Sequence, residues 1–111
     1  MLKLTIVMII FNVLTRGGVM KVENMTSSKG NKVANQFIVD GEHYGQEGQY
    51  FQSYDSIIAF KPANGTSITL DSKTWDYSKT TGTYRNQFLG ETKKETEVKI
   101  KNGTYILTNL N

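Results

Sequence analysis

One short segment constrains the fold of this chain more than any other part of its sequence. Pro62-Ala63-Asn64-Gly65 lies between two runs of residues that favour strands, 56–61 and 66–70. Proline presets the φ angle of a turn, and an Asn-Gly pair tolerates the positive φ angles that tight turns adopt. The segment 56–70 therefore predicts a β-hairpin.

Further strands are predicted on the N-terminal side of this hairpin. The run 33–39 has the composition of a strand and ends at 40–41, an Asp-Gly pair with turn chemistry. The run 49–52 is also strand-like, and the glycine-containing segment 42–48 is typical of a loop or a hairpin tip. Residues 53–56 favour a turn, because Ser and Asp side chains hydrogen-bond to the local backbone.

The sequence after the hairpin favours a short helix. Ser78 is a good N-cap residue, and apolar side chains follow it at helical spacing as far as Leu89. Gly90 stands where a C-terminal glycine is expected. We therefore predict a helix over residues 79–89.

The segment 92–107 carries two conflicting patterns. Thr92 and Glu95 match a capping box, and Gly103 suits the end of a helix. The run 97–101, however, alternates between charged and apolar residues, and the Asn-Gly pair after it leads into another strand-like run, which is a hairpin pattern. We favour a helix followed by a strand, because the capping box, the glycine and the abundant Lys and Glu agree with one another.

These elements predict an α+β fold with a small antiparallel sheet of three to four strands. One or two short C-terminal helices are expected to pack on that sheet. With 111 residues the chain has the size of one domain. We expect residues 33–111 to form that domain, and the polar segment 20–32 to be a flexible arm.

The first nineteen residues differ from the rest. The run 2–14 is almost wholly apolar, yet it is shorter than the about 20 residues that span a bilayer. A secretory signal is disfavoured, because Arg16 follows the run and no small-residue cleavage site is present. A short buried strand or helix is one alternative. The codons of Arg16-Gly17-Gly18 can also spell a ribosome-binding site for a natural start at Met20, which is the interpretation that we favour, with a cytoplasmic protein as its consequence.

The charge balance bears on the choice of partner. The chain carries 13 Lys and Arg against 10 Asp and Glu, a net charge of +3 that falls to +1 if Lys3 and Arg16 are not translated. A nearly neutral chain offers little support for binding to nucleic acid, and it is not acidic enough to mimic DNA. The absence of Cys excludes disulfides, thiolate catalysis and cysteine-based metal sites.

Candidate catalytic chemistry depends on His43, the only histidine. With Glu42 and Glu47 it could form part of a metal site, but a lone loop histidine is more often merely solvated. No Gly-x-Ser-x-Gly elbow, P-loop or dinucleotide motif is present. We therefore expect a protein that is not an enzyme, without catalytic residues, a metal, a cofactor or a small-molecule substrate.

Three segments resemble a known family. They are Phe51–Ala59 with its Ser-Tyr-Asp-Ser-Ile-Ile-Ala run, the Trp-Asp-Tyr-Ser-Lys-Thr-Thr run 75–81, and Tyr84–Gly90 with its Asn-Gln-Phe-Leu run. Together they resemble small proteins of unknown function that are common on phages, plasmids and conjugative elements of Gram-positive bacteria. The resemblance covers about residues 49–111. It implies an origin on a mobile element, and it brings no activity and no catalytic residues.

The best candidates for binding a partner lie in the second and third of these segments: Trp75, Tyr77, Tyr84, Arg85 and Asn86. Aromatic side chains beside an arginine stack on bases or anchor protein interfaces. The alternative is that Trp75 and Tyr84 belong to the core that joins the sheet to a helix. For Tyr77 and Arg85 both interpretations stay open.

The function that these observations favour is that of a small, non-enzymatic binding protein of a mobile element. It would contact a partner protein through the region 75–89, as an inhibitor of a host defence complex of the anti-CRISPR or anti-restriction type does. The alternative is a nucleic-acid-binding accessory protein in transfer, replication or regulation of the element. No membrane partner is expected.

Overall fold

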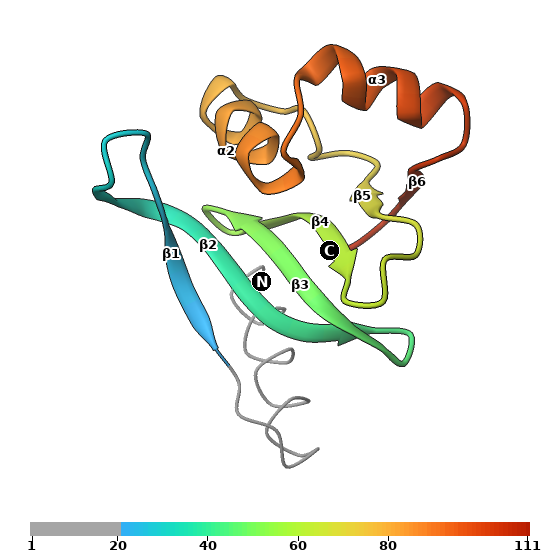
Figure 1. Cartoon of the computed structure of the whole chain (residues 1–111), viewed down its shortest axis with the longest axis horizontal. Coiled ribbons are helices and arrows are strands. Elements are labelled where there is room, and N and C mark those ends of the chain that lie inside the picture. The colour runs from blue at the N-terminus through green and yellow to red at the C-terminus, as the bar shows by residue number, and fades with distance from the viewer. Residues whose placement is uncertain (1–20) are drawn as a thin grey trace.

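A computed structural model describes residues 21–111 of the chain (Figure 1). The predictions for residues 1–19 and for a start at Met20 lie outside this part. The described elements, in chain order, are β1 (Val22–Thr26), β2 (Lys32–His43), β3 (Gln46–Ser53), β4 (Ser56–Pro62), β5 (Thr69–Asp71), α2 (Lys79–Leu89), α3 (Lys93–Lys101) and β6 (Ile106–Thr108). The fold is α+β, as the sequence predicts.

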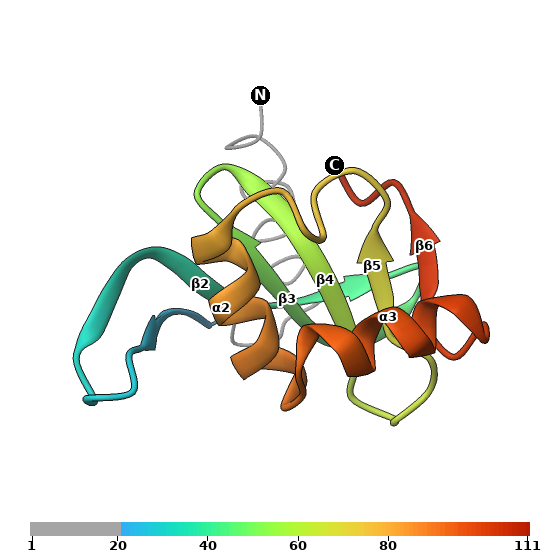
Figure 2. The ribbon, with the colours of Figure 1, turned by 90° about the horizontal axis from the view of Figure 1, so that it is seen from above.

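The sheet is larger than expected and is not purely antiparallel. It has six strands in the order β1-β2-β3-β4-β5-β6, where three to four were predicted. Each strand from β1 to β4 pairs antiparallel with the next, whereas β5 and β6 pair in parallel. The two strands are parallel because of the connection between them. The helices α2 and α3 carry the chain back to the end of the sheet at which β5 begins, so β6 runs in the same direction as β5 (Figure 2).

The strand β1 corrects the expectation of a flexible arm over residues 20–32. Asn24 pairs with Phe37 of β2, and its side-chain amide donates a hydrogen bond of 2.9 Å to the carbonyl oxygen of Val33. Met25 is buried in the main core. An edge strand needs only one buried apolar side chain and a pairing partner, so a polar sequence does not exclude it.

The predicted turn at Asp40-Gly41 is also wrong. Both residues lie within β2, where they pair with Gln49 and Gly48 of β3. The chain turns instead at Tyr44 and Gly45, whose φ angles are 49° and 82°. Strand pairing with β3 thus overrides the local turn preference of Asp-Gly. The hairpin tip expected within residues 42–48 is confirmed.

The predicted hairpin over residues 56–70 is confirmed, with a shorter second strand. Ala59 pairs with Leu70 and Phe60 pairs with Thr69, in antiparallel register. The second strand, β5, begins at Thr69 rather than at residue 66.

Both C-terminal helices are confirmed. The helix α2 has the predicted bounds, with Ser78 as its N-cap and Gly90 in the left-handed conformation at its end. The helix α3 begins with the predicted capping box, in which Thr92 and Glu95 bond to each other's backbone N–H groups. The segment 92–107 is therefore a helix followed by a strand.

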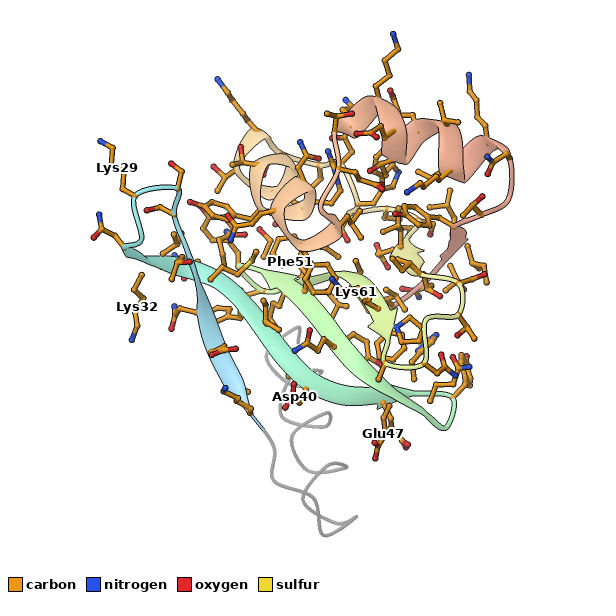
Figure 3. All side chains as sticks on the ribbon, in the orientation of Figure 1. Lys29, Lys32, Asp40, Glu47, Phe51 and Lys61 are labelled. Carbon is orange, nitrogen blue, oxygen red and sulfur yellow. The ribbon has the colours of Figure 1, made fainter. Side chains whose placement is uncertain are left out.

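The pleat of the sheet separates two apolar clusters. Ile38, Phe51, Ala59 and Leu70 are register partners across β2 to β5 and face the helices. Figure 1 shows both helices on this one side of the sheet, and Figure 3 shows Phe51 beneath them. The ring of Phe51 lies 5.7 Å from that of Phe88 on α2.

A second row, Val39, Tyr50 and Phe60, lies on the opposite face of the sheet, together with Leu110. Its side chains alternate with those of the first row along each strand, as a pleated sheet requires. In the described part of the chain, no helix is long and apolar enough to cross a membrane.

Candidate functional site

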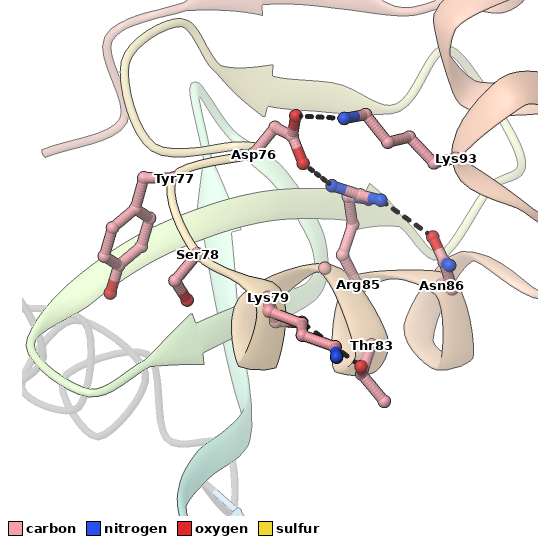
Figure 4. A pocket seen from close by; sticks show the side chains of 9 residues that line it. Asp76, Tyr77, Ser78, Lys79, Thr83, Arg85, Asn86 and Lys93 are labelled. Atoms are coloured by element: carbon pink, nitrogen blue, oxygen red, sulfur yellow. Dashed lines mark hydrogen bonds and ion pairs between the residues drawn. The ribbon is translucent and has the colours of Figure 1, made fainter.

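A surface pocket of about 470 Å³ lies at the start of α2, where the loop before this helix meets the start of α3 (Figure 4). The loop residues come from the Trp-x-Tyr-Ser segment that the sequence singles out. The pocket is lined by Asp76, Tyr77, Ser78, Lys79, Gly82, Thr83, Arg85, Asn86 and Lys93.

Arg85 forms the floor of this pocket, with only 1% of its surface exposed. Its Nη1 donates hydrogen bonds to the carbonyl oxygen of Trp75, at 2.9 Å, and to Oδ1 of Asp76, at 3.0 Å. Its Nη2 donates to Oδ1 of Asn86, at 2.9 Å. The guanidinium carbon lies 5.2 Å from the centre of the Trp75 ring, within the range of a cation–π contact. These contacts fix the guanidinium in one position.

Asp76 links Arg85 to the second helix. Its Oδ2 lies 2.7 Å from Nζ of Lys93, the first residue of α3. Burial alone would raise the pKa of Asp76, but the hydrogen bonds and charges of Lys93 and Arg85 outweigh it and hold this pKa below its ordinary value. The carboxylate therefore stays ionised and ties the loop, α2 and α3 together.

The N-cap of α2 joins the pocket to the sheet. Oγ of Ser78 accepts a hydrogen bond of 3.1 Å from the backbone N–H of Thr81 and donates one of 2.9 Å to its Oγ1. The hydroxyls of Thr81 and Ser53 are 2.8 Å apart, and both side chains are fully buried. This line of hydroxyls fixes the start of α2 against β3.

Tyr77 and Tyr54 are half-exposed aromatic residues of adjoining segments, and we call the two together the tyrosine rim. Their exposed fractions are 46% and 47%. The hydroxyl of Tyr77 donates a hydrogen bond of 3.4 Å to the carbonyl oxygen of Ser53, the residue before Tyr54. The Tyr77 hydroxyl thus lies at the β3–β4 turn that carries Tyr54, while Tyr77 also lines the pocket.

The structure divides the five predicted binding residues into two groups. Tyr77, Arg85 and Asn86 line the pocket, and among these three only Tyr77 is well exposed. Trp75 and Tyr84 are partly buried against the main core, in agreement with the core alternative. Arg85 is a buried support of the pocket and does not project from the surface.

Sequence reasoning missed Asp76, Gly82 and Lys93. Asp76 could have been found, because it lies between two of the predicted residues and has the charge to neutralise Arg85. Lys93 could not have been found from the sequence, since its contact with Asp76 depends on how α3 packs beside α2. Tyr54 was not named as a binding residue; it was placed in a predicted turn, which is correct, and its φ angle is 53°.

His43 lies at the end of β2 and not in a solvated loop. Its ring contacts those of Tyr44, Tyr50 and Phe60, with centres 4.5, 6.3 and 5.3 Å away. Burial against these rings lowers its pKa. Within residues 21–111, no group of three or more His, Cys, Asp or Glu side chains is placed to hold a metal ion.

The comparison with protein families gives one match. The model of a family of unknown function (DUF8033) matches residues 20–103. The chain belongs to this family. All residues that line the pocket lie inside the matched range, and β6 lies outside it. No curated protein and no solved structure matches the chain.

Proposed function

We propose that this member of the family is a non-enzymatic binding protein of a mobile element, and that it contacts a partner protein through the tyrosine rim and the pocket beside it. The observation that carries the proposal is the half-exposed ring of Tyr77, which lines a pocket with a buried arginine and whose hydroxyl bonds to the turn that carries the half-exposed Tyr54. Protein interfaces are enriched in Tyr, Trp and Arg, and tyrosine loses little side-chain entropy on binding.

The charges around the pocket favour a protein over a nucleic acid. Arg85 and Lys93 both face the carboxylate of Asp76 within 3.0 Å. Non-specific binding to nucleic acid depends on cations that neutralise backbone phosphates. Two of the three cations at this pocket already pair with Asp76, which leaves Lys79 as a weak basis for such binding.

The carboxylates with shifted pKa values support a role without catalysis. Hydrogen bonds and ion pairs hold the pKa values of Asp71, Asp76 and Glu91 below the ordinary range, although burial opposes the shift in each case. A general acid near neutral pH needs the opposite shift. Each of these carboxylates bonds to a neighbouring element and serves the fold.

The type of partner that we propose is a host defence complex, such as a CRISPR nuclease or a restriction enzyme of a Gram-positive host. The support is the resemblance of the Trp-x-Tyr-Ser segment to proteins of mobile elements, together with the half-exposed ring of Tyr77 in this segment. An inhibitor of this type blocks its target by occupying a surface and needs no reaction of its own.

An interference assay tests this proposal. The chain is expressed in hosts that carry a CRISPR nuclease or a restriction system, and the efficiency of phage plating is measured. We expect a rise in plating that Tyr77→Ala abolishes and Tyr44→Ala retains. Tyr44 is a matched control, because it is 93% exposed and lies at the β2–β3 turn, outside the pocket lining.

Two results would contradict the proposal. Unimpaired interference in every host with the wild-type chain would exclude the defence inhibitor. A gel shift with DNA or RNA that weakens steeply with salt would favour the accessory role in transfer, replication or regulation instead. An aromatic protein interface does not produce that salt dependence.

A further inference from the structure

Gly82 is a glycine that neither the packing nor the backbone of α2 requires. A Cβ placed on it would meet nothing nearer than Arg85 Nη2 at 3.6 Å, Arg85 Nη1 at 3.8 Å and Asp76 Oδ1 at 3.9 Å, which are ordinary contact distances. Its φ angle is not positive, and alanine is the better residue inside a helix. A glycine in such a place keeps a space open beside the backbone.

The open space over Gly82 borders a positively charged floor. Arg85 lies directly beside it, and Lys79 and Lys93 complete the lining. Arg85 is 1% exposed, and its Nε has no hydrogen-bond partner among the described residues. A buried guanidinium N–H without an acceptor costs free energy, so an oxygen ligand beside this guanidinium would be stabilising.

The start of α2 adds to this positive charge. The first turn of the helix contains no acidic residue, in contrast to the first turn of α3 with Glu95. The first N–H groups of a helix have no acceptor inside the helix and attract anions. Thr81 uses Ser78 as its acceptor, whereas the N–H groups of Lys79 and Thr80 have no intrahelical one.

We propose that the space over Gly82 receives the carboxylate of an acidic side chain on the partner protein, a conclusion that rests on the proposed function. The carboxylate lies beside the guanidinium of Arg85 and within reach of Lys79 and Lys93. The tyrosine rim supplies the apolar contact, and this pocket supplies the charged one. The pocket thus selects a surface that presents a Glu or an Asp next to an apolar patch.

The presence of Asp76 in the same pocket favours a carboxylate over a phosphate. Asp76 already compensates part of the charge of Arg85 and of Lys93. The lining then has two positive charges in excess, and Asp76 repels an entering dianion more strongly than a monoanion. A single carboxylate suits this balance.

Nuclear magnetic resonance of the full chain tests the inference with a defined probe. The probe is N-acetyl-glutamate N-methylamide, which carries one carboxylate, and its glutamine analogue is the uncharged control. We expect the glutamate compound to bind in the range of about 1 mM, and to shift the Arg85 Nε–H signal and the amide signals of Gly82 and Thr83. The glutamine analogue leaves these signals unchanged.

Gly82→Ala separates binding from folding. The added methyl group occupies the proposed space without a clash, so the variant is expected to unfold at a higher temperature and to bind the glutamate probe at least about tenfold more weakly. A structural glycine would give the opposite change in stability. Lys93→Met is expected to weaken binding, and Lys94→Met, at an exposed neighbour outside the pocket lining, is not.

Three outcomes would overturn the inference: equal binding by wild type and Gly82→Ala, equal shifts with the glutamine analogue, or stronger shifts at the same signals with inorganic phosphate. These outcomes are distinct from failure of the proposed function. If the probe binds at Gly82 while no host system is inhibited, the carboxylate site stands and the defence role falls. If inhibition depends on Tyr77 while Gly82→Ala inhibits as wild type does, the defence role is supported and the carboxylate site is contradicted.

Discussion

At the scale of single residues, Asp76 is the side chain on which the candidate site depends. It balances a buried arginine and an exposed lysine from two different helices. A buried guanidinium without its carboxylate is strongly unfavourable, whereas a surface ion pair contributes little. The bond to Arg85 therefore matters more for stability than the bond to Lys93.

We predict that Asp76→Asn lowers the free energy of unfolding by about 1–3 kcal/mol, because Arg85 keeps a hydrogen-bond acceptor but loses its counter-charge. Urea denaturation measures this change. Asp55→Asn is the matched control, since Asp55 is exposed in the turn between β3 and β4, and it should change stability by less than about 0.5 kcal/mol. Equal effects of the two substitutions would show that the buried ion pair is not important.

Residue types in the segments 75–81 and 84–90 made part of the site predictable. Tyr77, Arg85 and Asn86 were singled out as binding residues and do line one pocket. The sequence did not indicate that Arg85 is buried, because burial depends on Trp75 and Asp76 closing over it. Gly82 was not singled out as a binding residue, because the open space beside it is visible only in the structure, next to the guanidinium of Arg85.

At the scale of elements, the helices were predictable because their signals are local. The N-cap of α2, the left-handed Gly90 after it and the capping box of α3 are each set by neighbours a few residues apart. The strand β1 lacks such a signal, since it is short and polar and is stabilised by pairing with β2. A five-residue polar strand cannot be told from an arm by its sequence alone.

The carboxylate of Asp71, the last residue of β5, holds the chain around the end of this strand. Asp71 accepts hydrogen bonds from the backbone N–H groups of Lys73, Thr74 and Leu110, the last at 2.7 Å. Burial raises the pKa of Asp71, but hydrogen bonds lower this pKa by more than burial raises it, so the net shift is downward. The bond to Leu110 connects the C-terminal segment to β5.

We predict that this carboxylate makes stability depend on acidity. A pKa that is lower in the folded than in the unfolded state gives stability that is complete above the unfolded value, about 3.9, and is lost as the pH falls through the folded value. Urea denaturation between pH 6 and pH 2.5 measures the loss. Asp71→Asn should be less stable than wild type at pH 6 and should flatten the profile. If the dependence of stability on pH were the same in this variant as in the wild type, it would have to come from Asp76 and Glu91 instead.

At the scale of the whole molecule, the strand order was beyond sequence reasoning. The sheet grows strand by strand from β1 to β5, as short connections favour, and ends with a parallel strand that arrives after two helices. Neither the six strands nor the parallel pair follows from local patterns, since both depend on contacts between distant segments. The α+β class itself was predictable, because the hairpin and the helices are separate in the sequence.

The contribution of β1 to the whole fold is testable through Met25, its buried residue. We predict that Met25→Ala lowers the free energy of unfolding by about 2–4 kcal/mol, because a core cavity replaces the side chain. Val22→Ala on the same strand should cost less than about 1 kcal/mol, since Val22 is 39% exposed. Thermal and urea unfolding of both variants measure the difference. A negligible effect of Met25→Ala would show that β1 does not contribute to the stability of the fold and that residues 21–32 behave as an arm.

The parallel pairing of β5 with β6 has a consequence for how this architecture can vary. The segment between them, with α2, α3 and the pocket, leaves the sheet at one strand and re-enters at its neighbour, about 4.8 Å away. Its two ends are therefore held at a fixed spacing, whatever lies between them. Such an excursion can be lengthened, shortened or exchanged as a cassette while β1 to β4 keep their register, so the helices and the pocket can diversify independently of the scaffold that carries them.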